Sequence, residues 1–258
     1  MAIVQTDALV LRSYRLGETS LIVHLFTEAH GLLRCVAKGA RGPKSRFGGC
    51  LEPGVRLSAV IYRKAERDLQ LLSKADITAY WPALWEDPDR FARAQAVLEF
   101  LERAAYGEAE DAALLAFAVA TLTAMAEAPV PALEAVLRGF EVRACTLLGY
   151  APELSSCLEC QKPLGQGGLF HPIRGGLLCG EPCGGDAASF RISERARKTL
   201  IALGEREPAS IGTWAMERYP GPEVSRAIER FLSAHLERFD GLRSTRVGER
   251  LARYAEGA

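Results

Sequence analysis

The sequence has 258 residues, of which 48% are hydrophobic, and equal numbers of basic and acidic side chains, 32 of each. This length suffices for one large domain or for two to three small ones. No stretch approaches the roughly 18 uncharged apolar residues that a membrane span requires. The first twelve residues lack the basic start and apolar run of a secretory signal. We therefore expect a soluble cytoplasmic protein.

The charges are distributed unevenly along the chain. Residues 1–80 carry a net charge of +5, residues 81–153 carry −7, and residues 154–258 carry +2. A basic head followed by an acidic middle suggests a polyanionic partner for the head.

The first 80 residues have the pattern of short strands. Apolar and β-branched runs alternate with turn signals such as Leu16-Gly17-Glu18 and Glu52-Pro53-Gly54. The expected strands are 8–14, 20–27, 32–37, 56–63 and 69–79. Five short strands with polar turns predict a small barrel, and the pattern alone allows an oligonucleotide-binding (OB) fold or an SH3-like barrel.

The rest of the chain is expected to be mainly helical. Asp87-Pro88 is a typical helix start, because aspartate caps a helix and proline fits its first turn. Apolar residues then recur at helical spacing from Phe91 to Ala105, and further helices are expected at 111–126, 131–148, 193–203 and 222–239. The predicted fold is multidomain α+β. It has a barrel over 1–80, a helical domain over 81–153 and 187–258, and a cysteine-rich module at 154–186.

Four of the seven cysteines lie close together in the sequence, at Cys157, Cys160, Cys179 and Cys183. Two turns that each carry two cysteines can place four thiolates around one tetrahedral Zn²⁺. Short hairpin strands are expected between the pairs, at 168–170 and 176–178. Such a site has no open position for water, so the zinc is expected to be structural.

Two alternatives to this zinc site stay open. His171 lies within the loop and could replace one cysteine ligand, and the thiols could also be reduced and free of metal. The scattered Cys35, Cys50 and Cys145 are expected to be small buried hydrophobic side chains.

The candidate DNA-binding site is the segment 31–51, which contains five basic side chains and no acidic one. They are Arg34, Lys38, Arg41, Lys44 and Arg46. Because alternate residues of a strand share a face, Arg34 and Lys38 are expected on one side of the barrel. Cations beside a flexible, glycine-rich loop can follow a phosphate chain. The alternative is a solvated surface that serves solubility.

Other residues could extend this site. The basic candidates are Arg12, Arg15, Arg63, Lys64 and Arg67. Aromatic side chains that could stack on bases are Tyr14, Phe47 and Tyr62. Phe47 is favoured because it lies in the polar loop.

No catalytic constellation emerges from the sequence. Segment 39–45 differs from a phosphate-binding loop because Pro43 separates Gly42 from Lys44. The acidic residues Glu108, Glu110 and Asp111 could hold the metal of a nuclease, but acidic residues are also expected at the start of a helix. We expect a protein that is not an enzyme.

Several segments in combination resemble those of one family. The opening run is ALVLRSYRLGETS (8–20), followed by Leu25-Phe26-Thr27 with Gly31 and by VAKGAR (36–41) with Lys44-Ser45. Residues 138–154, which lead into Cys157-x-x-Cys160, and residues 235–244 near the end complete the set. On these motifs, which span nearly the whole chain, the sequence resembles the RecO recombination mediators of bacteria.

The resemblance implies an N-terminal OB fold, a central helical domain and an inserted zinc module. It also implies binding of single- and double-stranded DNA and annealing of complementary strands, including strands coated by single-stranded-DNA-binding protein (SSB). With the partner RecR, and in some settings RecF, such proteins help RecA to replace SSB, which implies a location at the nucleoid. The phosphate-binding role maps by position onto the five basic residues of 31–51.

Two further expectations concern partners. The SSB tail is acidic and hydrophobic, and Arg138 and Arg143 are candidate cations for it. The competing function is a zinc-containing OB-fold accessory factor that prefers structured RNA over single-stranded DNA.

Overall fold

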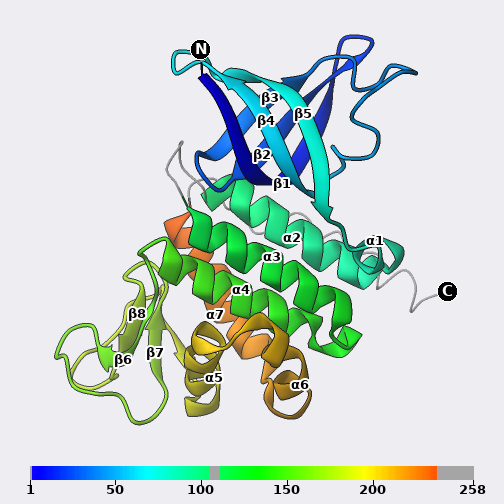
Figure 1. Cartoon of the computed structure of the whole chain (residues 1–258). Helices are drawn as coiled ribbons and strands as arrows, with labels where there is room; N and C mark the ends of the chain where they lie inside the picture. The colour runs from blue at the N-terminus through cyan, green and yellow to red at the C-terminus, as the bar shows by residue number, and fades with distance from the viewer. Residues whose placement is uncertain (1, 105–110, 237–258) are drawn as a thin grey trace.

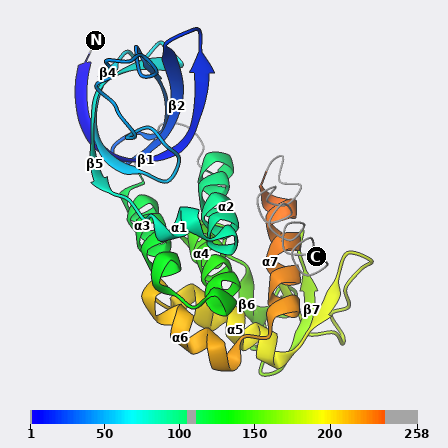
Figure 2. The same cartoon turned by 90° about the vertical axis from the view of Figure 1, so that its right-hand side faces the viewer.

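The computed structural model describes residues 2–104 and 111–236. The chain folds into a five-stranded barrel, a layer of helices and a small four-stranded sheet (Figure 1). The barrel and the small sheet lie on opposite sides of the helical layer (Figures 1 and 2).

The barrel contains five strands: β1 (Ala2–Leu16), β2 (Ser20–Thr27), β3 (Gly31–Ala37), β4 (Arg56–Arg63) and β5 (Leu69–Ala79). Their order is β1-β2-β3-β5-β4, and β4 pairs again with β1, so that the pairings form a ring (Figure 2). The β3–β5 join is parallel and has three residue pairs, whereas the other pairs are antiparallel. This mixed, OB-like arrangement confirms the expected fold class.

The strand boundaries agree with the sequence pattern except in β1. This strand begins six residues earlier than expected, because Ala2–Asp7 pair with the Ser58–Arg63 stretch of β4. The early part of β1 has no strong alternation of its own, so its extension depends on a pairing partner that lies more than fifty residues away.

The helical layer is built around α4 (Leu133–Leu147). The other helices are α1 (Ala83–Glu86), α2 (Pro88–Ala104), α3 (Ala112–Glu127), α5 (Glu194–Glu205), α6 (Pro208–Arg218) and α7 (Gly221–His235), with a 3₁₀ turn at Val130–Ala132. Helix α4 packs against α2, α3, α5, α6 and α7. Within the described ranges, no helix is both long enough and apolar enough to cross a membrane.

The small sheet carries the cysteines. It consists of β6 (Glu153–Cys157), β7 (Gly168–His171), β8 (Gly176–Leu178) and β9 (Phe190–Ile192), in the order β6-β8-β7-β9. The β7–β8 pair is the hairpin expected from the sequence. Strands β6 and β9 and helices α1 and α6 were not predicted. The positions of Ala105, Glu108, Glu110 and Phe239, and segment 237–244 of the family resemblance, lie outside the described residues.

The barrel joins the helical layer through the outer face of β1 and β2. Leu9, Leu11 and Phe26 belong to the helical core, whereas Ala8 and Val10 belong to the core of the barrel. Alternation along the strand sends these two pairs of side chains to opposite faces. A register shift between Val10 and Arg12 in the β1–β2 pairing then places Arg12 on the outer face directly after Leu11. Strand β1 is therefore buried on both faces where it meets the helices.

A second contact at this junction needs a glycine. Gly54 has a φ of +81°, and a Cβ built on it would lie 2.2 Å from Cζ2 of Trp85 on α1. Phe91, expected on the buried face of α2, is 42% exposed and instead packs edge-on against Trp85, with ring centroids 5.6 Å apart. The indole ring thus fills the space at the junction.

Glu102 of α2 links the helical layer to the barrel electrostatically. Its Oε2 accepts from Arg12 at 3.0 Å and its Oε1 lies 2.8 Å from His24 Nδ1. Burial alone would raise the pKa of Glu102, but the hydrogen bond with His24 and the charge of Arg12 lower it below its ordinary value of 4.5.

We predict that Gly54→Ala destabilises the protein more than Gly48→Ala. Gly48 also has a positive φ, of +50°, but a Cβ there has nothing within 4 Å. The control should lower the free energy of unfolding by about 1 kcal/mol for the left-handed backbone. Gly54→Ala should lower the free energy of unfolding by about a further 1–3 kcal/mol, because the new Cβ clashes with Trp85. Denaturant unfolding measures the stability of both variants. Equal losses would contradict the close contact between Gly54 and Trp85.

We also predict that Glu102→Gln flattens the acid dependence of stability. A lowered pKa in the folded state means that the Glu102 contribution is present above about pH 4.5 and is lost as the pH falls through the folded pKa. At neutral pH the variant should lose about 1 kcal/mol of unfolding free energy. Unfolding curves at several pH values should converge with wild type in acid, and a constant gap would contradict this assignment.

Candidate nucleic-acid interface and metal site

Strand β3 presents its basic residues to solvent because its side chains alternate. Leu33, Cys35 and Ala37 point into the barrel and are at most 2% exposed. Arg34 and Lys38 lie on the outer face with Val36 between them, and both cations are exposed. The expected pairing of Arg34 and Lys38 on one face therefore matches the strand geometry.

Strand register aligns the outer residues into two rows across the barrel. One row holds Arg12, His24, Arg34 and Leu69. The next row holds Tyr14, Ile22, Val36, Leu71 and Tyr62. All five members of the second row are at least partly exposed. On β3 this apolar row is flanked by Arg34 on one side and Lys38 on the other.

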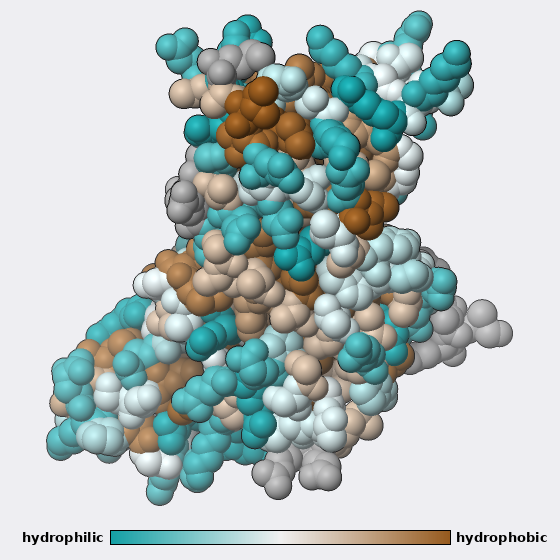
Figure 3. Space-filling view, in the orientation of Figure 1, coloured by the Kyte–Doolittle hydropathy of each residue, from teal (hydrophilic) through white to brown (hydrophobic). Residues whose placement is uncertain are grey.

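The loop after β3 extends the basic surface. Lys38, Lys44 and Arg46 are exposed. Like Arg34, they form no ion pair with any residue in the described part of the chain. In the space-filling view, hydrophilic side chains stand out from the end of the barrel away from the helices (Figure 3). Unpaired cations leave the positive potential of this end uncompensated.

Arg41 is exposed but has a structural role as well. Its backbone N–H donates to Thr19 O at 2.7 Å, and its guanidinium Nη1 donates to Glu18 O at 3.2 Å. These bonds attach the basic loop to the turn between β1 and β2. Loss of Arg41 would therefore change the position of the loop in addition to its charge.

The expectation that Phe47 is the favoured side chain for stacking on bases is wrong. Its side chain is 1% exposed and belongs to the barrel core, with the Arg46 guanidinium 5.3 Å from the ring centroid. The loop is polar but folds back, and Phe47 is the apolar side chain that closes the barrel beneath it. Tyr14 and Tyr62, by contrast, keep exposed ring surface on the outer row.

The remaining basic candidates differ in their surroundings. Arg15 and Lys64 are exposed, and Arg63 is half-buried. Arg12 is paired with Glu102 at the helical junction. Lys64 follows Tyr62 by two residues, in the turn just after β4.

The four clustered cysteines meet at the end of the small sheet. Their sulfur atoms all lie within 4.8 Å of one another, and they include Cys157 at the end of β6 and Cys179 just after β8. Backbone bonds shape each turn: Gln161 N donates to Cys157 O at 3.0 Å, and Gly180 N donates to Cys183 O at 3.1 Å. Four thiols at this separation could hold one metal ion.

The electrostatics of this cluster favour a cation. Burial disfavours the Cys157 thiolate, but the backbone N–H groups of Cys160, Glu159 and Cys179 outweigh it and lower its pKa to about 6. Burial and the neighbouring thiols raise the pKa of Cys183. Several thiolates can therefore coexist here when a positive ion compensates their repulsion.

The other sulfur and imidazole candidates lie outside this cluster. His171 is 5% exposed and has its Nε2 3.2 Å from Asp186 Oδ2, so that it supports the hairpin instead of joining the four sulfurs. Cys35 and Cys145 are buried as expected, whereas Cys50 is half-buried.

Arg138 is not available to a partner. It is 3% exposed and its guanidinium donates to Glu134 and Glu141, each at 2.8 Å, and to Glu229. Arg143 donates to Gly204 O at 3.3 Å, between α4 and α5. The expectation of Arg138 as a surface cation is wrong because its charge is needed to compensate buried carboxylates.

Comparison with known proteins covers nearly the whole chain. A family model described as "Recombination protein O N terminal" matches residues 1–81, and one described as "Recombination protein O C terminal" matches residues 85–246. The chain is 31% identical to "DNA repair protein RecO" of Anaeromyxobacter dehalogenans (strain 2CP-C) over 236 residues, which cover 91% of the chain and 92% of that protein.

Two relatives from Streptomyces are similar over their full length. The chain is 31% identical to "DNA repair protein RecO" of Streptomyces griseus subsp. griseus and 33% identical to the protein of the same name from Streptomyces coelicolor. Each match covers 97% of the chain and 100% of the relative.

We predict that Cys160→Ser removes a bound metal ion and destabilises the protein. Elemental analysis of the purified wild type should find one metal ion per chain and should identify the element. The variant should lose the metal and more than about 3 kcal/mol of unfolding free energy, because metal binding contributes directly to folding. Cys50→Ser, at a half-buried thiol outside the cluster, is the control and should retain the metal. A metal-free wild type of full stability would contradict the site.

Proposed function

Because the chain belongs to the RecO family of DNA repair proteins, we propose that it is a non-enzymatic recombination mediator that binds DNA through its barrel. The observation that carries this proposal is the set of exposed cations on β3 and its loop, which face solvent without partner carboxylates in the described chain. The set comprises Arg34, Lys38, Lys44 and Arg46, with Arg41 positioning the loop.

The proposed mechanism is electrostatic. Each cation that neutralises a phosphate releases condensed counterions, so that affinity decreases steeply with salt. Two strands bound beside the same cations repel each other less, which favours annealing of complementary strands, including strands coated by SSB. The apolar row beside the cations offers surface to unpaired bases and would retain strands until they pair.

The proposed partners follow from the family and not from a surface in this chain. We propose that the protein acts with RecR, in some settings with RecF, and helps RecA to replace SSB on DNA at the nucleoid. The segment 81–153, whose net charge is −7, would repel DNA and is better suited to protein contacts.

We propose that the metal of the cysteine cluster is zinc and that it is structural. Four thiolates are the donor set that Zn²⁺ prefers in structural sites, and four protein ligands leave no position for a reacting water. The nuclease alternative receives no support from Asp111, because its side chain caps α3 by accepting from Leu114 N at 3.0 Å.

We predict that the triple variant Lys38→Gln, Lys44→Gln and Arg46→Gln fails to anneal complementary oligonucleotides. Loss of three phosphate contacts should reduce the slope of log affinity against log salt by about 2 for single strands. Annealing by wild type and variant should be measured at low and high salt, with and without SSB. Arg41 is left in place because it anchors the loop.

The matched control removes three exposed cations from the other side of the helical layer: Arg191→Gln, Arg195→Gln and Lys198→Gln. This variant has the same net charge as the test variant and should anneal like wild type. Equal loss in both variants would mean that total charge, and not the barrel surface, matters. A wild type that binds structured RNA in preference to DNA would support the accessory-factor alternative, and one that binds neither would overturn the proposal.

A further inference from the structure

We propose that a groove between β3, β5 and the β4–β5 turn binds one unpaired nucleotide of a DNA single strand. The base would stack on Tyr62 and its phosphates would lie near Lys64 and Arg67. This inference rests on the proposed DNA-binding function, and it adds a site that selects single strands over duplex.

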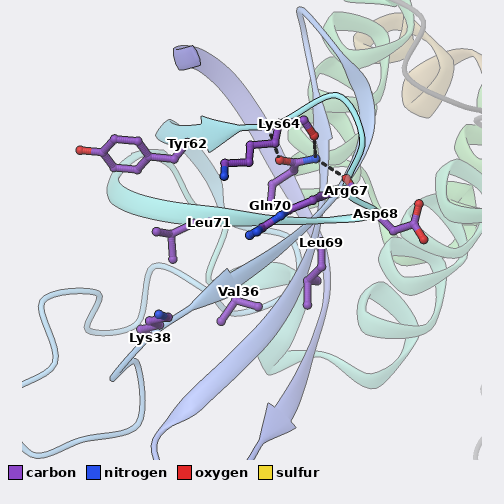
Figure 4. Close-up of a pocket in the computed structure, with 9 residues that line it drawn as sticks. All are labelled: Val36, Lys38, Tyr62, Lys64, Arg67, Asp68, Leu69, Gln70 and Leu71. Atoms are coloured by element: carbon purple, nitrogen blue, oxygen red, sulfur yellow. Dashed lines mark hydrogen bonds between the residues drawn. The ribbon is translucent and has the colours of Figure 1, made fainter. Parts of the chain in front are cut away.

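The groove has a volume of about 580 Å³, within the range of small-molecule sites. Its lining residues are Val36, Lys38, Tyr62, Lys64, Arg67, Asp68, Leu69, Gln70 and Leu71. In Figure 4 the ring of Tyr62 projects outward from β4, Lys64 and Arg67 lie beside Gln70 at the β4–β5 turn, and Lys38 lies across the labelled set from them. The groove therefore has an apolar floor, formed by Val36, Leu71 and Tyr62, and a cationic rim, formed by Lys38, Lys64 and Arg67.

The floor suits a nucleobase. Val36 and Leu71 are direct register partners across the β3–β5 join, and Tyr62 is the partner of Leu71 across β4–β5. These three outward side chains form a continuous apolar strip that ends in an aromatic ring. A base stacks favourably on such a ring irrespective of its identity, because every base has a π-face.

The rim suits a phosphate. Lys38 on one side of the groove and Lys64 and Arg67 on the other supply three cations, against the single carboxylate of Asp68 among the lining residues. All four of these side chains are exposed. The net positive rim matches the negative backbone of a strand whose base is on the floor.

A buried glutamine fixes the rim. Gln70 is 3% exposed; its Oε1 accepts from Lys64 N at 2.8 Å, and its Nε2 donates to Lys64 O at 3.0 Å and to Arg67 O. One side chain thus closes the turn on which both cations are carried. Their backbones are held in place before a ligand arrives, which reduces the ordering cost of binding.

The groove is also continuous with the proposed DNA path. Lys38 is one of the exposed cations of β3 and its loop and also lines the groove, so a strand bound at these cations can pass directly into the groove. A base within a duplex is stacked and paired, and its face cannot reach Tyr62 without unstacking. The groove therefore accepts single strands and excludes paired DNA.

The test compares Tyr62→Ala with Tyr62→Phe on two probes, an oligothymidylate and a blunt-ended duplex. Tyr62→Ala should weaken oligothymidylate binding about tenfold, as for loss of one stacked base, and leave duplex binding within about twofold. Tyr62→Phe keeps the ring and should bind like wild type. The control Tyr80→Ala removes another exposed tyrosine, which lies outside the groove, and should have no effect.

A photocrosslink adds a direct readout. An oligothymidylate that contains halogenated uracil should crosslink to Tyr62, as located by mass spectrometry of the peptides. Unchanged oligothymidylate affinity in Tyr62→Ala, or equal losses on both probes, would overturn the groove proposal while DNA binding by the barrel stands. Failure of the wild type to bind either probe would instead overturn the proposed function itself.

Discussion

Burial of β1 on both faces is the constraint on which the rest of the arrangement depends. Its inner face completes the barrel, and its outer face, with Leu9 and Leu11, enters the helical core beside Phe26 of β2. Helices therefore cover the β1–β2 side of the barrel at that end. The outer surface that remains accessible runs over β3, β5 and the loop after β3, and this is where the unpaired cations lie. Docking of the barrel thus determines which of its cations stay open to solvent.

The acidic middle of the chain is used in two different ways. Glu102 reaches across the junction and neutralises Arg12, which marks the end of the basic surface next to the helices. Deeper in the layer, Glu134 and Glu141 surround the buried Arg138. Burial raises the pKa of Glu141 to about 7 despite this guanidinium. A carboxylate in such a place depends on its partner, so removal of Arg138 would leave an uncompensated charge in the core.

Local patterns in the sequence predicted most of the fold, and nonlocal contacts account for what they missed. The limits of β2, β4 and β5 follow from runs of apolar residues between turns, and the cysteine spacing located the cluster that the structure brings together. The early part of β1, and β6 and β9, form through distant pairing partners. Phe47 and Arg138 were misjudged for the same reason, since a polar loop that folds back and a buried acidic cluster are visible only in three dimensions.

The cysteine cluster lies away from the barrel, so a metal ion held there would not contact a nucleic acid on the barrel surface. The small sheet lies across the helical layer from the barrel (Figure 1). Its inner side chains, including Phe170 and Leu177, belong to the same core as α4. Arg197 of α5 donates to Leu154 O at 2.9 Å, which ties β6 to the following helix. A metal ion that ordered this sheet would therefore stabilise the packing of α4 and α5, while the barrel surface depends on β1 and its junction. The proposed DNA binding and the proposed metal-dependent stability should accordingly be separable by mutation in this chain.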